Sequence, residues 1–202
     1  AETDVRAFMD LNKLQMHTKF IPDLDTLEDL SRDDVRAVVH RSCKRLDVES
    51  LDLVQFHWWD YSKGDLVQAA LYLDELRKEG VIKAIGLTNF DCVHTQKLLD
   101  AGIPIVSNQV QFSLLDTRPL NGMMELAENN NIAIFCYGVL AGGLLAGAAH
   151  DPQNRSHIKY GLVAEEAGKD TFDNILNSLD QLASKYKTSK GNIAAQFVLQ
   201  TP

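Results

Sequence analysis

The chain has 202 residues, of which 45% are hydrophobic and 24% charged, and its formal net charge is −8. This composition is typical of a globular protein with a sizeable core, and we expect residues 1–202 to form a single domain. The negative charge and the scattered basic residues argue against a nucleic-acid-binding or anionic-membrane surface. The 3 cysteines form no C-x-x-C pair, which favours a reducing compartment, the cytoplasm or an organelle stroma or matrix.

Short apolar runs alternate with helical patterns along most of the chain. The predicted strands are Gln15–Phe20, Leu51–His57, Val81–Thr88, Ile105–Gln111 and Ile132–Tyr137. Six helices are predicted between and after these strands. The first begins at the cap Ser31 and has Val35, Val38, Val39 and Leu46 on its apolar face, the second covers Leu66–Leu76 and is closed by Gly80, and the third runs from the cap Asp91 to Gly102. The fourth is opened by Pro119, the fifth covers Phe172–Tyr186, and the sixth covers Ile193–Leu199. Residues Ala141–Lys169 show little regular pattern, and we expect a long loop there. Such alternation predicts parallel βαβ units.

The predicted strands have one aliphatic face and one small or polar face. The aliphatic set is Val54, Phe56, Ile85, Leu87, Val106, Val110, Ile132 and Ile134, and it should pack on the helices. The opposite set is Gln55, His57, Gly86, Thr88, Ser107, Gln109, Gln111 and Tyr137. An open doubly wound sheet would need apolar residues on both faces. The pattern therefore favours an α/β fold of the (β/α)8 TIM-barrel type, incomplete because we find five strand–helix units.

In such a barrel the active site is built at the C-terminal ends of the strands. The five predicted strands lead to residues suited to redox chemistry, which are Lys19, His57, Asn89, Gln109 and Tyr137. We therefore expect these residues to line one concave surface. In an incomplete barrel the strands leading to Lys19 and Tyr137 should be the two edges of the sheet, open to a protein partner or a second copy.

Two other functional classes receive little support from the sequence. Residues Ile132–Ala149 carry no charge over a length that reaches the threshold for a membrane span. Their four glycines and strand-like start instead predict a buried strand followed by a glycine-rich loop, so we expect no membrane insertion. The histidines show no metal-ligand spacing, and we expect no metal site.

Four runs of sequence, taken together, resemble the aldo-keto reductase family. They are Asp52-Leu-Val-Gln-Phe-His57, Gly86-Leu-Thr-Asn-Phe90, Asn108-Gln-Val110 and Tyr137-Gly-Val-Leu-Ala-Gly-Gly-Leu-Leu145. The match is colinear, and each run lies at a predicted strand end. The resemblance implies a (β/α)8 barrel that uses NADPH or NADH to reduce the carbonyl of a small aldehyde or ketone, with NADP as the family-level choice of cofactor and NADPH preferred over NADH.

The resemblance also implies a role for each matching residue. His57 matches the histidine that orients the substrate carbonyl, and Lys19 matches the lysine that lowers the pKa of a catalytic tyrosine. The matches to the residues that hold the nicotinamide carboxamide are Thr88, Asn89 and Gln109. Tyr137 matches the aromatic residue that stacks on the nicotinamide ring. Leu140 and Gly142 fall where the family's loop begins to follow the cofactor pyrophosphate.

The chemistry of hydride transfer independently favours these residue types. Side-chain amides and hydroxyls can read a carboxamide, and a flat aromatic side chain can hold one face of a ring. The carbonyl oxygen becomes an alkoxide, so donors around it lower the barrier. Protonation then needs an acid whose pKa is pulled toward neutrality, which a nearby lysine can do for a tyrosine.

The sequence departs from the family pattern in two places. We find neither the catalytic tyrosine, five residues after an aspartate, nor the glycine-started loop that binds the adenosine phosphate. The chain thus matches an internal segment of the family barrel. A carbonyl reductase remains our first interpretation, and a non-catalytic structural or regulatory subunit of a larger assembly is the alternative. Three further alternatives stay open: a surface role for Lys19, a core role for Tyr137, and either a substrate-pocket or a loop-packing role for Trp58 and Trp59.

Overall fold

The computed structural model describes residues 14–149, 151 and 153–201. The chain divides into two compact units. The first comprises Ala1–Gln109 with Leu126–Phe135, and the second comprises Val110–Glu125 with Cys136–Pro202.

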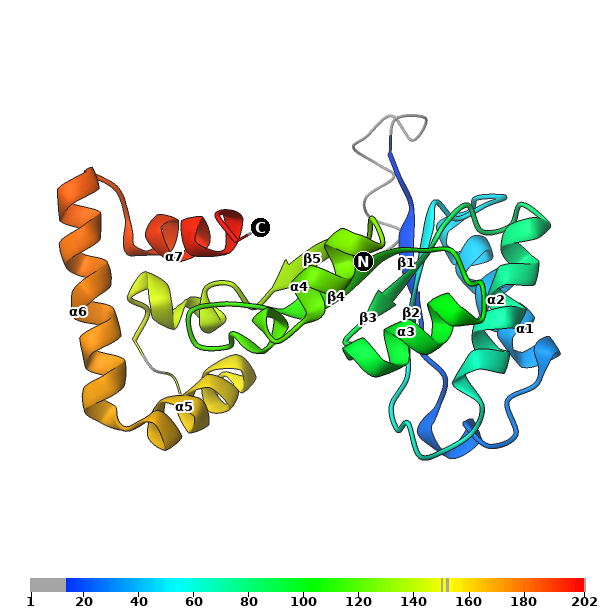
Figure 1. Cartoon of the computed structure of the whole chain (residues 1–202), viewed down its shortest axis with the longest axis horizontal. Coiled ribbons are helices and arrows are strands. Elements are labelled where there is room, and N and C mark those ends of the chain that lie inside the picture. The colour runs from blue at the N-terminus through cyan, green and yellow to red at the C-terminus, as the bar shows by residue number, and fades with distance from the viewer. Residues whose placement is uncertain (1–13, 150, 152, 202) are drawn as a thin grey trace. The chain divides into compact units, whose positions relative to one another are not determined.

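The five predicted strands are all present, and they form one sheet in chain order (Figure 1). They are β1 (His17–Phe20), β2 (Leu53–His57), β3 (Ile85–Thr88), β4 (Ile105–Gln111) and β5 (Ala133–Tyr137). β1 to β4 pair in parallel, which confirms the predicted βαβ units. Within the described part of the chain, β1 and β5 are the terminal strands of the sheet, as expected.

The strand register decides which side chains share a face. His57 pairs with Thr88, and Thr88 pairs with Gln109, so these three residues form one row across neighbouring strands. Two positions earlier along the strands, a second row joins the partners Lys19, Gln55, Gly86 and Ser107. Because side chains in a strand alternate with a period of two, both rows lie on one face, which we call the inner face.

The opposite face is the aliphatic one, and it packs on helices as predicted. Val54, Phe56, Ile85 and Leu87 are buried in the core of the first unit. Val106 does not follow this prediction, because its side chain is 41% exposed. The β3–β4 pairing shifts at this point, from Ile85 opposite Ile105 to Gly86 opposite Ser107, which leaves Val106 as the extra residue of a bulge.

Three helices cover the aliphatic face of the first unit, and each begins at a side-chain cap. They are α1 (Arg32–Leu46), α2 (Leu66–Lys78) and α3 (Cys92–Asp100), with α1 and α2 side by side (Figure 1). Ser31 accepts from the Asp34 amide while Asp34 accepts from the Ser31 amide, and this capping box confirms the predicted start of α1. Asp91 accepts from the His94 amide at 2.7 Å and starts α3, as predicted.

The predicted helix opened by Pro119 is split in the structure. Pro119 belongs to the 3-10 helix η4 (Arg118–Leu120), and α4 begins only at Met123 and runs to Asn129. Gly122, with φ of 91°, stands between them. A residue in that left-handed region ends the first helical turn, so one predicted helix becomes two.

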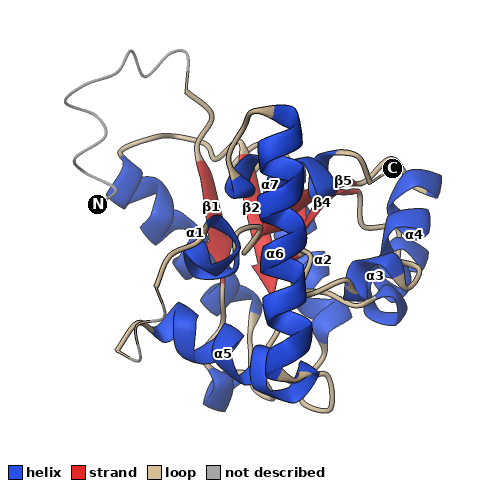
Figure 2. Cartoon of the chain, turned by 90° about the vertical axis from the view of Figure 1, so that its left-hand side faces the viewer, coloured by secondary structure: helices blue, strands red, loops and turns tan. Residues whose placement is uncertain are grey.

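The second unit contains the 3-10 helix η5 (Ala141–Ala146) and helices α5 (Arg155–Ala167), α6 (Lys169–Tyr186) and α7 (Lys190–Leu199). The predicted long loop over Ala141–Lys169 is therefore wrong. Its C-terminal part forms α5, where the buried residues among the side chains that the structure describes are His157 and Tyr160, so its apolar periodicity is weak. The predicted helices over Phe172–Tyr186 and Ile193–Leu199 are confirmed, and α6 is an unbroken rod (Figure 2).

The core of the second unit forms where η5 meets three helices. It is built by Ala141, Leu144, Leu145, Tyr160, Leu179 and Ala194. No helix in the ranges that the structure describes has both the length and the apolar character needed to cross a membrane.

Candidate active site

Three of the predicted site residues stand in one row on the inner face of the first unit. His57 and Thr88 are the last residues of β2 and β3, and Gln109 is their register partner in β4. Neighbouring parallel strands lie about 4.8 Å apart, so the row presents an imidazole, a hydroxyl and an amide side by side. The structure thus brings together, at the C-terminal ends of parallel strands, three side chains that are far apart in the sequence.

The His57 imidazole is fixed by contacts on two sides. Its Nδ1 lies 3.1 Å from the Thr88 carbonyl oxygen. A carbonyl oxygen only accepts, so Nδ1 carries the proton and Nε2 of the neutral ring is an acceptor. The Trp59 ring meets the imidazole edge to face, with centroids 4.6 Å apart, and Trp59 Nε1 donates to the Pro22 carbonyl oxygen at 2.7 Å.

Buried polar atoms without a hydrogen-bond partner gather on the inner face. Among the described residues, they include Thr88 Oγ1 and Gln109 Oε1 in the row of His57, and Gln55 Nε2 and Ser107 Oγ in the neighbouring row. A buried polar group that lacks a partner costs about 1–3 kcal/mol. Such a group is therefore suited to receive a ligand, and a hydroxyl beside an amide oxygen fits a carboxamide.

Asn89 is held at the end of β3 by its backbone. Its φ of 59° is in the left-handed region, which asparagine tolerates better than most residues. Its amide donates to the Gln109 carbonyl oxygen at 2.8 Å, and its own carbonyl oxygen accepts from the Tyr61 hydroxyl at 3.5 Å. The exposed Asn89 side chain therefore starts from a fixed point next to the end of β4.

Lys19 lies on the same face but not in the row of His57. It pairs with Gln55, two residues before His57 in β2, and its side chain is exposed. The strand ends at Phe20, as predicted, and Phe20 is buried in the core.

The other three predicted site residues belong to the second unit. Tyr137 ends β5, and its carbonyl oxygen accepts from the Phe112 amide at 3.1 Å. Leu140 is half-exposed and accepts at its carbonyl oxygen from the Gly143 amide at 2.9 Å. Gly142 has φ of 69°, and a Cβ there would lie 2.9 Å from the Ser156 Cβ. Only glycine fits this close approach of η5 to α5.

Three side chains near these residues were missed or left undecided by the sequence. Trp58 is buried and donates to the carbonyl oxygens of Asp60 and Lys63, so it is a core residue. Trp59 is 55% exposed and flanks His57, so the two tryptophans have different roles. Lys159 donates to Gln111 Oε1, and its Nζ lies 6.0 Å from the centre of the Tyr137 ring. The sequence did not indicate a role for Lys159, because the helix α5 that carries it was not predicted.

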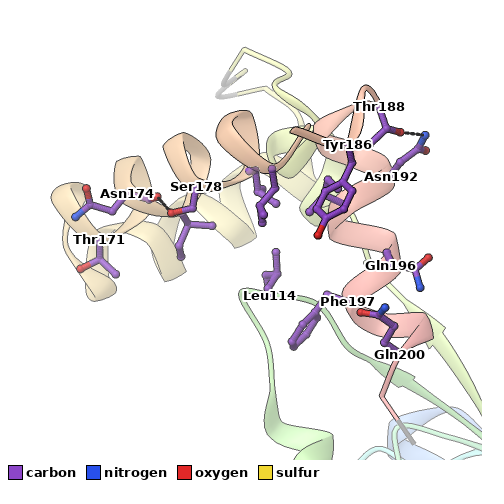
Figure 3. Close-up of a pocket in the computed structure, with 14 residues that line it drawn as sticks. Leu114, Thr171, Asn174, Ser178, Tyr186, Thr188, Asn192, Gln196, Phe197 and Gln200 are labelled. Atoms are coloured by element: carbon purple, nitrogen blue, oxygen red, sulfur yellow. Dashed lines mark hydrogen bonds between the residues drawn. The ribbon is translucent and has the colours of Figure 1, made fainter. Parts of the chain in front are cut away.

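A cavity of about 910 Å³ lies in the second unit and has a different lining (Figure 3). It is bounded by Leu114, Thr171, Asn174, Ile175, Ser178, Leu179, Leu182, Tyr186, Thr188, Asn192, Ile193, Gln196, Phe197 and Gln200. None of the predicted site residues lines it. In the described part of the chain, no group of three or more His, Cys, Asp or Glu residues is arranged to hold a metal ion.

Comparison with known proteins gives one consistent result. The model of the family described as "Aldo/keto reductase family" matches residues 7–202. A protein of Escherichia coli named NADH-specific methylglyoxal reductase is 26% identical over 188 residues, covering 89% of this chain and 56% of that protein. The chain thus spans about half the length of the curated relatives it matches.

Two solved structures share the fold. A glycerol dehydrogenase from Gluconobacter oxydans superposes with a TM-score of 0.77 at 24% identity, covering 98% of this chain and 64% of that chain. An aldo/keto reductase from Klebsiella pneumoniae, solved in complex with NADP and acetate, superposes with a TM-score of 0.69 at 16% identity, covering 100% of this chain and 60% of that chain. These likenesses support a TIM-barrel-type α/β architecture. With the family model matching nearly the whole sequence, the chain belongs to the aldo/keto reductase family.

Proposed function

We propose that this chain carries the substrate-carbonyl and nicotinamide part of an oxidoreductase site that transfers hydride from NAD(P)H to an aldehyde or ketone. The observation that carries the proposal is the row of His57, Thr88 and Gln109 at the ends of adjacent parallel strands, with two buried polar atoms that lack partners. Family membership supports the class of reaction.

In this proposal each residue of the inner face has a distinct task. Thr88, Asn89 and Gln109 would hold the nicotinamide carboxamide, for which the Thr88 hydroxyl and the Gln109 amide oxygen are available. The bound cofactor supplies the hydride. His57 orients the substrate carbonyl through Nε2. Because Nδ1 faces the Thr88 carbonyl oxygen, Nε2 donates to the substrate oxygen only when the imidazole is protonated.

In the second unit, we propose that Tyr137 stacks on the nicotinamide ring and that Leu140 and Gly142 follow the pyrophosphate. NADP is the proposed cofactor, with NADPH preferred over NADH on family resemblance. The relatives point both ways, since one is named NADH-specific and another was solved with NADP.

The reaction also needs a group that donates a proton to the alkoxide oxygen. Lys19 is proposed to lower the pKa of a catalytic tyrosine. Tyr61 is unsuited to that role, because burial and the nearby Asp91 carboxylate raise its pKa to about 12. Burial also raises the pKa of Tyr160. A general acid needs a pKa shifted the other way, toward neutrality. The alternative proposal is a non-catalytic structural or regulatory subunit that binds cofactor without turnover.

Two further proposals concern the surroundings of the protein. The three cysteines form no C-x-x-C pair, which supports a reducing compartment such as the cytoplasm or an organelle stroma or matrix. The strands β1 and β5 end the described sheet, and a protein partner or a second copy is proposed to pair there.

The test is a comparison of Thr88→Val with Ser107→Ala. Both changes remove a buried hydroxyl that lacks a partner, so neither should lower the thermal midpoint of the cofactor-free protein. Only Thr88→Val removes a proposed cofactor contact, and it should weaken NADPH binding by about ten-fold, or 1.4 kcal/mol. Binding is measured by titration with tryptophan fluorescence, and turnover by NADPH consumption with methylglyoxal and other small carbonyls.

The outcomes separate the possibilities. Equal affinity in wild type and Thr88→Val, or equal weakening in Ser107→Ala, would contradict the proposed cofactor site. Cofactor binding without consumption of NADPH would support the non-catalytic alternative.

A further inference from the structure

His157 is a buried imidazole in the first turn of α5, and both of its nitrogens make hydrogen bonds. Its side chain is 5% exposed. Nδ1 lies 2.9 Å from the Asp151 amide nitrogen, and Nε2 lies 2.9 Å from the Gly142 carbonyl oxygen. A backbone amide only donates and a carbonyl oxygen only accepts, so Nδ1 is bare and Nε2 carries the proton. The contacts therefore require one neutral tautomer.

The Nε2 contact ties α5 to η5 at a glycine whose backbone is in the left-handed region. Gly142 has φ of 69°, and a Cβ there would lie 2.9 Å from the Ser156 Cβ and 3.2 Å from His157 Cδ2. The backbone of η5 thus rests directly against the residues that begin α5. Glycine adopts this left-handed conformation readily and several others besides, and the bond from His157 restrains its carbonyl group in this one.

Several hydrogen bonds define the start of α5, where His157 lies. Asn154 caps the helix by accepting from the Ser156 amide at 3.0 Å, and its own amide donates to the Asp151 carbonyl oxygen at 3.1 Å. The Asp151 side chain in turn accepts from the Gln153 amide at 2.9 Å. These hydrogen bonds therefore position both His157 and the Asp151 amide that donates to its Nδ1.

We propose that His157 is a positioning residue for cofactor binding: it holds the Gly142 backbone in the conformation that receives the pyrophosphate. The inference rests on the proposed function, which gives Leu140 and Gly142 that contact. His157 acts only through Gly142 and touches no cofactor atom. The bond from Nε2 to Gly142 sets the affinity, whereas the bond to Nδ1 secures the preceding turn.

Three substitutions separate the two bonds. His157→Gln keeps a donor near the Nε2 position, His157→Asn keeps an acceptor near the Nδ1 position, and His157→Phe keeps the ring volume without either. Ile158→Ala is the matched control, because Ile158 is the next residue of the same helical turn and is 47% exposed. The readouts are the NADPH dissociation constant and the hydrogen-exchange rate of the Asp151 amide in cofactor-free protein.

We expect the two readouts to follow different atoms. NADPH binding should weaken by about ten-fold in His157→Phe and His157→Asn, and His157→Gln should recover most of it. Exchange of the Asp151 amide should be at least about ten-fold faster in His157→Phe and His157→Gln, and near wild type in His157→Asn. Ile158→Ala should change neither, which a general loosening of α5 would not predict.

Wild-type affinity in His157→Phe, equally weak binding in His157→Gln and His157→Phe, or the same loss in Ile158→Ala would overturn the proposal. If His157→Phe does not fold, the comparison of His157→Gln with His157→Asn still tests the proposal, because the two variants are expected to differ in opposite directions in NADPH affinity and in Asp151 amide exchange. A wild-type protein that binds neither NADPH nor NADH would instead overturn the proposed function, so the two failures are distinguishable.

Discussion

The Nδ1 atom of His57 lies 3.1 Å from the carbonyl oxygen of Thr88, the residue that faces it across the β2–β3 pairing. This contact joins the proposed carbonyl-orienting residue to the proposed carboxamide-binding residue through the backbone of β3. It also sets the tautomer of His57, because a carbonyl oxygen can only accept a hydrogen bond. His157 requires the opposite tautomer, because its Nδ1 accepts a hydrogen bond from the Asp151 amide.

We predict that the two neutral imidazoles are opposite tautomers. The measurement is a long-range ¹H–¹⁵N correlation spectrum at a pH where both rings are neutral. His57 should show a protonated Nδ1 and an acceptor-type Nε2, and His157 the reverse. His57→Asn and His157→Asn proteins provide the assignments. Identical nitrogen shift patterns for the two rings would show that one of these contacts does not persist in solution.

Replacement of Gly86 by alanine is predicted to destabilise the protein while Ser107 keeps its hydroxyl. A Cβ on Gly86 would lie 2.3 Å from Ser107 Oγ and 3.3 Å from Leu53 Cδ1. Gly86→Ala should therefore lower the free energy of unfolding by about 1–3 kcal/mol, as overpacking does in well-packed cores. Adding Ser107→Ala removes the closest atom, and the double variant should recover part of the loss. Denaturant unfolding of the two single variants and the double variant measures this coupling, and strict additivity would argue against the contact.

Asp52 is predicted to stabilise the fold at neutral pH but not in acid. Its carboxylate accepts from Lys83 Nζ at 2.7 Å and from the Met16 amide at 2.7 Å. These hydrogen bonds hold the pKa of Asp52 below its usual value of 3.8. Because the folded pKa is depressed, the stabilisation is present above the unfolded pKa and is lost as the pH falls through the folded pKa.

Asp52→Asn should consequently cost about 0.5–1 kcal/mol of unfolding free energy at pH 7, a modest value because Lys83 is largely exposed. Unfolding measured between about pH 2 and pH 7 should show the wild-type and variant curves converging at the acid end. Lys83→Met is the matched control, since it removes the partner charge and leaves the carboxylate. A wild-type advantage that stays constant down to pH 2 would exclude this ion pair as its source.

All three thiols are predicted to react slowly with electrophiles. Burial raises the pKa of Cys43, Cys92 and Cys136 above the usual thiol value, and Asp91 adds to the effect at Cys92. The thiolate is the reactive form, so a higher pKa lowers its fraction near neutral pH. Titration with a disulfide reagent at pH 8 should give rates below that of free cysteine, with Cys43, which is 6% exposed, the slowest. A fast-reacting thiol would instead identify an electropositive environment that these contacts do not contain.

Much of the first unit follows from local sequence signals. Alternation with a period of two placed the polar and aliphatic faces correctly in β2 and β3, because a strand fixes which side chains share a face. Ser31 and Asp91 marked their helix starts, because a side-chain oxygen that satisfies exposed amides is a local interaction. The colinear runs around His57, Gly86 and Asn108 then indicated the family, which the family model confirms.

Other features depended on contacts between distant residues. The bulge that exposes Val106 arises from the β3–β4 register, and nothing in the run around Val106 signals it. The sequence showed little sign of helix α5, because few of its described side chains are buried apolar ones and because it packs against η5 and α6, segments that come before and after it in the chain. The different environments of Trp58 and Trp59 also appear only in the folded chain, where one ring enters the core and the other meets His57.

The sequence by itself determined the residue types of the candidate site and their order along the chain. Only the tertiary structure decided that His57, Thr88 and Gln109 share one row, that Lys19 stands in the next row, and that the neutral His57 ring is protonated at Nδ1. The physical reason is that strand register and hydrogen-bond partners are set by pairing between segments that are far apart in the chain. A local pattern fixes the face of a side chain, but it does not fix its neighbour on the next strand.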